Sequence, residues 1–116
     1  MKLNTSREVN IKTQKMSLYE ILVPTIINDK PVRTKHHKNF DAKVRRISGG
    51  LTILKPAVGN WISPNGELFL ERMIPVRIAC NEKQINTIAD IAAKHYNQIA
   101  VMYYKITDNV VIKHYK

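Results

Sequence analysis

One stretch, residues 67–97, restricts the fold more than any other part of the chain. Apolar residues alternate along positions 74–80, which is the period-2 pattern of a half-buried strand. Asn81 ends the alternation, and Gln84 follows it by three residues, the spacing at which two side chains satisfy each other's backbone N–H groups at a helix start. Apolar residues then recur at helical spacing up to about residue 97. The stretch therefore predicts a strand followed directly by a helix that covers one side of a sheet.

The other elements follow from the same two periodicities. We expect further strands at residues 18–23, 51–54, 99–106 and 110–113, and a first helix at residues 34–48. Pro64-Asn65-Gly66 is typical of a turn and joins the second strand to the long strand as a hairpin. The resulting order, β-α-β-β-α-β with an added C-terminal strand, predicts a ferredoxin-like α+β fold, in which two helices cover one face of an antiparallel sheet.

Helices on one face leave the other face of the sheet open. We expect Tyr19, Trp61, Met102 and Tyr103 on that open face. An apolar, aromatic face of this kind is typical of a protein interface. The sequence therefore predicts a homodimer or a higher homo-oligomer.

A chain of 116 residues is long enough for one domain, which we place at residues 16–116, after a flexible basic arm at residues 1–15. The arm lacks the apolar region of a secretory signal. No apolar run approaches the roughly 18 residues that a membrane span needs. We therefore expect a cytoplasmic protein without a membrane partner.

Positive charge is the strongest compositional signal. Nineteen Lys and Arg against nine Asp and Glu give a net charge of +10, and residues 30–46 hold seven of the cations with one acid, Asp41. On the first predicted helix the cations lie opposite the apolar stripe, with Asp41 placed to pair with Arg45. Such a face attracts an anionic ligand, although a purely solubilising surface would have the same composition.

Aromatic residues lie beyond this basic segment, and cations combined with stacking aromatics are typical of nucleotide and single-strand binding. We therefore predict a site for a phosphate-bearing ligand, either nucleic acid or a nucleotide, on a basic helix face. Its expected residues are Arg33, Lys35, Lys38, Arg45 and Arg46 for the phosphates, with Trp61 and Tyr104 for stacking. The alternative for Trp61 is a rim residue that packs the hairpin onto the sheet.

No catalytic or metal site is predicted. Cys80 is the only cysteine and falls on the apolar side of a strand, where a thiol is inert. His36 and His37 are adjacent on a helix and point about 100° apart, so they cannot chelate one ion. Glu67 and Glu71 have a spacing that suits paired carboxylates, but salt bridges to nearby arginines are the simpler interpretation. We expect no cofactor.

Several segments resemble a family of small uncharacterised proteins encoded by tailed bacteriophages. The resemblance covers residues 16–113 and lies in Gly49-Gly50-Leu51-Thr52-Ile53, in Gly59-Asn60-Trp61 and in residues 71–80 and 95–104. It implies an accessory protein made inside an infected bacterium, where such proteins bind nucleic acid, modify host machinery or counteract host defences. It supplies no catalytic residues.

Two other functions fit the same sequence. The basic face could dock an acidic host protein, which would make the chain a protein-interaction module. A small dimeric α+β enzyme that uses Glu71 or a histidine is the third alternative.

Overall fold

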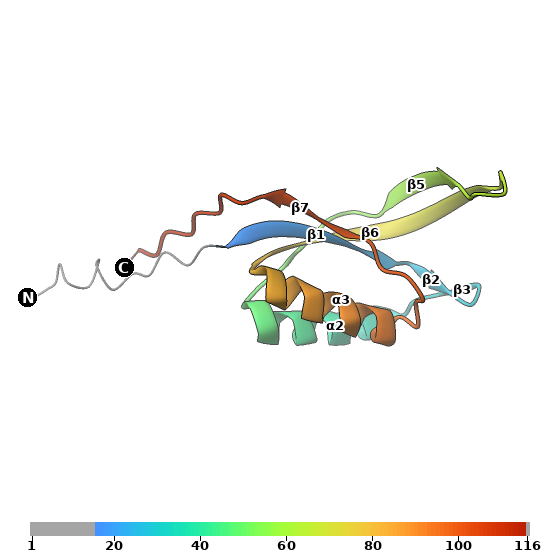
Figure 1. Cartoon of the computed structure of the whole chain (residues 1–116). Coiled ribbons are helices and arrows are strands. Elements are labelled where there is room, and N and C mark those ends of the chain that lie inside the picture. The colour runs from blue at the N-terminus through green and yellow to red at the C-terminus, as the bar shows by residue number, and fades with distance from the viewer. Residues whose placement is uncertain (1–15, 116) are drawn as a thin grey trace, which may run out of the picture.

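The computed structural model describes residues 16–115, and its elements follow the expected α+β order (Figure 1). The segment 1–15, for which the sequence predicts a flexible arm, lies outside the described residues. The elements are β1 (Ser17–Pro24), β2 (Ile26–Ile27), β3 (Lys30–Pro31), α2 (Thr34–Ser48), β4 (Thr52–Ile53), β5 (Ala57–Ile62), β6 (Leu68–Cys80), α3 (Glu82–His95) and β7 (Tyr103–Thr107).

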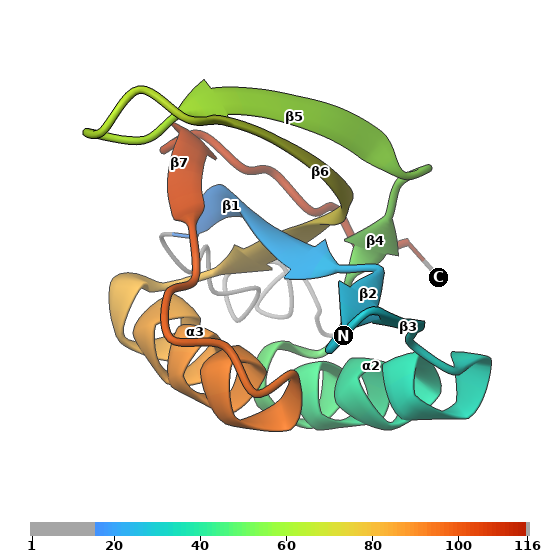
Figure 2. The ribbon, with the colours of Figure 1, turned by 90° about the vertical axis from the view of Figure 1, so that its right-hand side faces the viewer.

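The sheet is antiparallel and confirms the ferredoxin-like fold. Its strand order is β4-β6-β1-β7, and β5 also pairs with β6. Figure 2 shows α2 and α3 side by side beneath the sheet. β1 and β6 pair along the whole of β1 and form the centre of the sheet. The tip of the β5–β6 hairpin extends beyond the ends of the helices (Figure 1).

Local sequence signals set the helix ends. At α3 the capping box is present: the Gln84 N–H donates to Asn81 Oδ1 at 2.8 Å, and the Asn81 N–H donates to Gln84 Oε1 at 3.0 Å. α2 ends at Gly49, whose φ of 88° is the left-handed conformation that glycine adopts most readily. Its start has no side-chain cap, because Arg33 occupies the N-cap position.

The second strand, predicted at residues 51–54, is present as the short strand β4, and a separate strand that was not predicted, β5, follows it before the hairpin turn. β4 and β5 both pair with β6, but three residues separate Ile53 from Ala57 while only two separate their partners Val76 and Met73. One extra residue therefore sits in the connecting segment, which contains Pro56, a residue without an N–H to donate to the ladder.

The C-terminal strand is present as β7, which pairs with β1 and starts at Tyr103 rather than at residue 99. Residues 110–113, where the sequence predicts a further short strand, form no strand. Thr107 is therefore the last strand residue in the described part of the chain.

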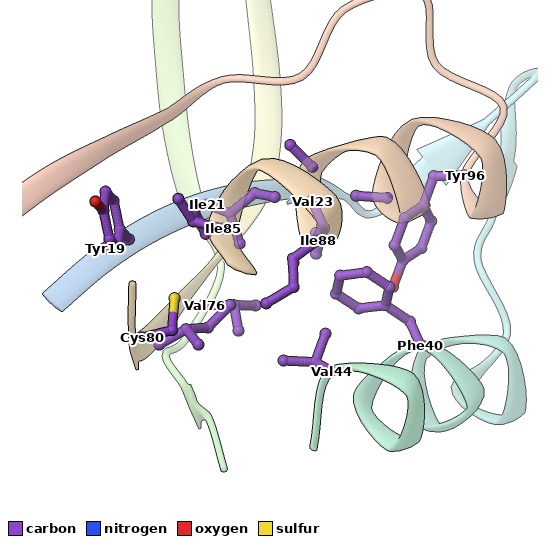
Figure 3. Packing of buried hydrophobic residues seen from close by; sticks show 13 residues of the cluster. Tyr19, Ile21, Val23, Phe40, Val44, Val76, Cys80, Ile85, Ile88 and Tyr96 are labelled. Carbon is purple, nitrogen blue, oxygen red and sulfur yellow. The ribbon is translucent and has the colours of Figure 1, made fainter. Parts of the chain in front are cut away.

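The core lies between the sheet and the two helices (Figure 3). Side chains from β1 and β6 meet Phe40 and Val44 of α2 and the apolar stripe of α3, and Tyr96 closes the cluster with no exposed surface. Tyr19 belongs to this core, with 4 % exposure, so its predicted place on the open face is wrong. It shares its side of β1 with Ile21, and alternate residues of a strand face the same side.

Candidate ligand-binding site

Four of the predicted phosphate-binding cations form a band on the outer face of α2. Lys35, Lys38, Arg45 and Arg46 are exposed, and at 100° per residue they fall on the side of the helix opposite its buried residues. Over the eleven steps from the first to the last, the band runs for about 16 Å along the helix axis. We call these four residues the basic band.

No member of the basic band forms an ion pair with an acid in residues 16–115. The predicted pair of Asp41 and Arg45 is therefore not formed. Burial raises the pKa of Asp41 above its ordinary value, although the charges of His37 and Arg45 act in the opposite direction. Arg33 is also exposed and lies just before α2 as its N-cap residue.

The predicted stacking residue Trp61 lies elsewhere, beside an apolar pocket of about 480 Å³. We call this cavity the Trp61 pocket. Its walls come from the end of β1 (Leu22, Val23, Pro24), from β5 (Gly59, Asn60, Trp61), from β6 (Glu71, Met73), from α3 and its C-cap (Ala92, Tyr96) and from the segment before β7 (Gln98, Ala100, Val101, Met102). A concave, mostly apolar cavity with a few polar groups is the usual form of a small-molecule site.

The indole of Trp61 is held in a fixed orientation. Its Nε1–H donates to Glu71 Oε1 at 2.7 Å. The Phe69 ring stacks on it with the ring centroids 4.6 Å apart and the planes 16° apart. Phe69 and Trp61 are direct partners in the β5–β6 ladder, so the hairpin register places them together. The sequence predicted a salt bridge for Glu71, and its contact with Trp61 was not predicted.

The charge of the Trp61 pocket does not suit a phosphate. Glu71 is the one ionisable acid of its lining, and no Lys or Arg contributes to it. No residue of α2 lines it either, so the structure does not bring Trp61 and the basic band into one site. A flat, uncharged aromatic group fits the cavity better than an anion does.

Tyr104, the second predicted stacking residue, is engaged within the sheet. Its hydroxyl donates to Glu20 Oε2, and Arg77 Nε donates to Glu20 Oε1 at 2.9 Å. Burial raises the pKa of Glu20, but the hydrogen bond from Tyr104 and the charge and hydrogen bond of Arg77 outweigh it, so this pKa lies below its ordinary value. Tyr104 does not line the Trp61 pocket.

Histidines, which the prediction left without a ligand role, join the two helices. His36 Nε2–H donates to the His95 carbonyl at 2.7 Å, and His95 Nε2–H donates to the His36 carbonyl at 2.8 Å. The two rings are stacked, with centroids 3.9 Å apart. His37 Nδ1 lies 2.7 Å from the Tyr96 hydroxyl. Across residues 16–115, no group of three or more His, Cys, Asp or Glu side chains is arranged to hold a metal ion.

The β5–β6 hairpin exposes large apolar side chains. Their exposed fractions range from 38 % to 69 %, in Val58, Trp61, Ile62, Leu68, Phe69 and Leu70. Met102 and Ile106 add to the exposed apolar surface. Within the described part of the chain, no helix is long and apolar enough to cross a membrane.

Comparison with known proteins yields only structural neighbours. No protein-family model matches the chain, and no curated protein matches it. CutA from Xylella fastidiosa superposes with a TM-score of 0.63 at 12 % identity, over 85 % of this chain and 88 % of that one. The divalent cation tolerance protein Cut A1 from Thermus thermophilus superposes with a TM-score of 0.61 at 7 % identity, over 85 % of this chain and 87 % of that one.

A third neighbour is a phage SAM lyase in complex with S-methyl-5'-thioadenosine. Its TM-score is 0.57 at 16 % identity, over 80 % of this chain and 90 % of that one. At these identities the likeness establishes a shared fold and leaves function to be argued from the site.

Proposed function

We propose that this chain is a phage-encoded accessory protein that binds a nucleotide-like ligand, with the base of the ligand against Trp61. The observation that carries the proposal is the Trp61 pocket: a concave, largely apolar cavity whose indole is oriented by Glu71 and Phe69. An oriented indole is a stacking surface for a base. The phage origin rests on the sequence resemblance, and the shared fold of a phage lyase that holds a thioadenosine agrees with it.

The polar groups of the pocket favour a nucleoside over a free phosphate. Glu71 and the side-chain amides of Asn60 and Gln98 offer acceptors and donors that can read a base edge or a ribose. The single carboxylate disfavours an anion at the same place. The phosphates of a larger ligand would therefore have to lie outside the pocket.

The basic band is the second candidate surface, and it fits the phosphate-bearing part of the prediction. Four exposed cations in a row, without acidic partners in the described structure, form a surface that a nucleic-acid backbone can follow. We propose that it binds phosphates, with an acidic host protein as the alternative partner. The counteraction of host defences would be one use of either activity.

We also propose that the protein is a homo-oligomer that associates through the β5–β6 hairpin. Residues 57–72 carry two acids and one base, so the hairpin lacks the positive charge that would make two copies repel each other. Leu68→Lys should shift the molecular mass measured by light scattering toward the monomer. Val111→Lys, at an exposed position outside the hairpin, is the matched control.

The experiment for the pocket uses the intrinsic fluorescence of Trp61, which is the only tryptophan. We expect a saturable change on titration with adenosine, AMP or S-methyl-5'-thioadenosine. Glu71→Gln should weaken binding, whereas Glu67→Gln, at an acid just before β6 that does not line the pocket, should not. The absence of any saturable change, or equal effects of the two variants, would contradict the pocket assignment.

The basic band requires a separate measurement. A single-stranded oligonucleotide should bind with an affinity that falls as salt rises, and the slope should shrink by about one for each phosphate-contacting arginine removed. If Arg45→Ala combined with Arg46→Ala left the binding of DNA, RNA and nucleotides unchanged, the band would not be a phosphate surface.

A further inference from the structure

A groove lies between α2 and α3, on the side of α3 away from the Trp61 pocket. Its lining is positively charged, and neither the Trp61 pocket nor the basic band accounts for this charge. Its volume is about 630 Å³, and its lining is Lys43, Arg46, Lys94, His36, His95, Ile47 and Ile91. It shares no residue with the Trp61 pocket. Arg46 also belongs to the basic band, whereas Lys43 and Lys94 do not.

The groove has three permanent cations and no carboxylate in its lining. None of Lys43, Arg46 and Lys94 forms an ion pair with an acid of residues 16–115. Ile47 and Ile91 supply apolar surface beside these charges, and electrostatic attraction is stronger where water is partly displaced. Like charges gathered around a concave surface without an acid are typical of an anion site.

The histidines give the groove a fixed hydrogen-bonding state. A carbonyl oxygen only accepts, so His95 must carry its hydrogen on Nε2 to bind the His36 carbonyl. Its Nδ1 therefore holds a free lone pair, and Lys43 Nζ lies 3.2 Å from it. An ammonium group here donates to a neutral imidazole, a partner that does not balance its charge.

We propose that this groove binds a tetrahedral oxyanion of the phosphate type, such as inorganic phosphate or the phosphoryl group of a small molecule, and takes up a proton on His95 as it does so. The anion accepts from Lys43, Arg46 and Lys94. His95 Nδ1 gains a proton from solvent and donates to the anion, and Lys43 turns from the imidazole to the anion. With a divalent anion the net charge of the groove falls from +3 to +2, even though His95 has gained a proton.

The surroundings of His95 set the direction of the pH dependence. Burial lowers its pKa, as do the charges of His36 and Lys43, whereas its hydrogen bond to the His36 backbone and the charge of Asp41 raise it, with a net result below the ordinary value. The groups that face it are His36, His37, Asp41 and Lys43 from α2, with Lys94 and Tyr96 from its own end of α3. A bound anion raises the pKa of His95. The affinity for the anion must therefore increase as the pH falls from the His95 pKa of the complex to the lower His95 pKa of the free protein.

The test follows the imidazole resonances of the full chain by NMR during titration with sodium sulfate at constant ionic strength. Sulfate keeps its charge between pH 5 and pH 8, so any pH dependence belongs to the protein. We expect saturable shifts at His95, a higher His95 pKa at saturation, and tighter binding at low pH. A parallel titration with inorganic diphosphate should give a higher affinity. His114, exposed in the C-terminal segment, serves as the internal control for non-specific salt effects.

Matched variants decide whether the groove is responsible. Lys43→Gln keeps a donor for His95 Nδ1 but loses the charge, and it should weaken sulfate binding about fivefold, as should Lys94→Gln. Lys83→Gln removes an exposed cation of α3 that belongs neither to the groove lining nor to the basic band, and it should leave affinity unchanged. Unsaturable shifts, equal shifts at His114, or equal effects of Lys43→Gln and Lys83→Gln would overturn the proposal. Trp61 fluorescence is independent of this readout, so failure here leaves the pocket proposal standing.

Discussion

Glu20 contacts Tyr104 and Arg77, and this contact predicts both a loss of stability in variants and the pH at which that loss disappears. Glu20 lies on β1 directly opposite Arg77 of β6 and Tyr104 of β7, so one carboxylate links three strands. Only 7 % of Glu20 is exposed. We expect Tyr104→Phe, which deletes one hydroxyl, and Glu20→Gln, which deletes the charge, both to lower the free energy of unfolding.

The magnitude follows from the exposure of the partners. A hydrogen bond to a charged group contributes about 1.5 to 3 kcal/mol. Water reaches both donors, since 40 % of Tyr104 and 44 % of the Arg77 side chain are exposed. Solvent screening therefore reduces the expected loss for Tyr104→Phe to about 1 kcal/mol, below this range, and we expect about 2 kcal/mol for Glu20→Gln. In a double-mutant cycle the two losses should not add, because both variants act on the hydrogen bond between Tyr104 and Glu20.

The pH dependence has a definite sign. The folded-state pKa of Glu20 is lowered, so its contribution is fully present above the unfolded-state pKa of about 4.3 and is lost as the pH falls through the folded value. In urea denaturation at fixed protein concentration, the free energies of unfolding of wild type and Glu20→Gln should differ by the full amount at pH 7. This difference should disappear below about pH 4. A Glu20→Gln protein as stable as wild type at pH 7, or a difference unchanged at pH 3, would refute the reasoning.

Three further predictions concern stability and reactivity. Phe40→Ala should lower the free energy of unfolding by about 3 to 5 kcal/mol in urea denaturation, since a ring with no exposed surface leaves a cavity. Asn81→Ala should cost about 1 kcal/mol in the same assay by removing the cap of α3, whereas Asn81→Asp, which keeps the acceptor, should cost less. Burial raises the pKa of the Cys80 thiol to about 11, so a thiol reagent at pH 8 should modify it only as fast as the protein unfolds, and rapid modification of the native protein would contradict its burial.

The helices could be predicted from the sequence because their signals are local. The bounds predicted for α2, residues 34–48, agree with those in the structure, and the capping box of α3 forms between the two residues expected to make it. Gly49 ends α2 as its conformational freedom suggests. Each of these features depends on residues within one or two turns of each other, so a single sequence contains the whole cause.

The strands could be predicted less completely, because alternation alone does not fix the side that a residue faces. Tyr19 was assigned to the open face, yet its pairing with Ile78 places it in the core. Residues 110–113, Val-Val-Ile-Lys, are mostly β-branched like many strands but form no strand in the described structure. An apolar, β-branched sequence is therefore not sufficient for a strand, because the segment also needs a neighbouring strand to accept its backbone hydrogen bonds.

The predicted site is divided between α2 and the β5–β6 hairpin for a related reason. The cations of the basic band share a helix, so helical spacing alone puts them on one face, as predicted. Trp61 meets Glu71 because the turn at Ser63 to Gly66 sets the hairpin register, which pairs Gly59 with Glu71 and Trp61 with Phe69. That register could have been counted from the turn. The contact of His36 with His95 spans 59 residues and exists only once α2 and α3 dock antiparallel. The basic band therefore follows from local periodicity, whereas the groove between the helices forms only by tertiary packing and could not be predicted from a local pattern.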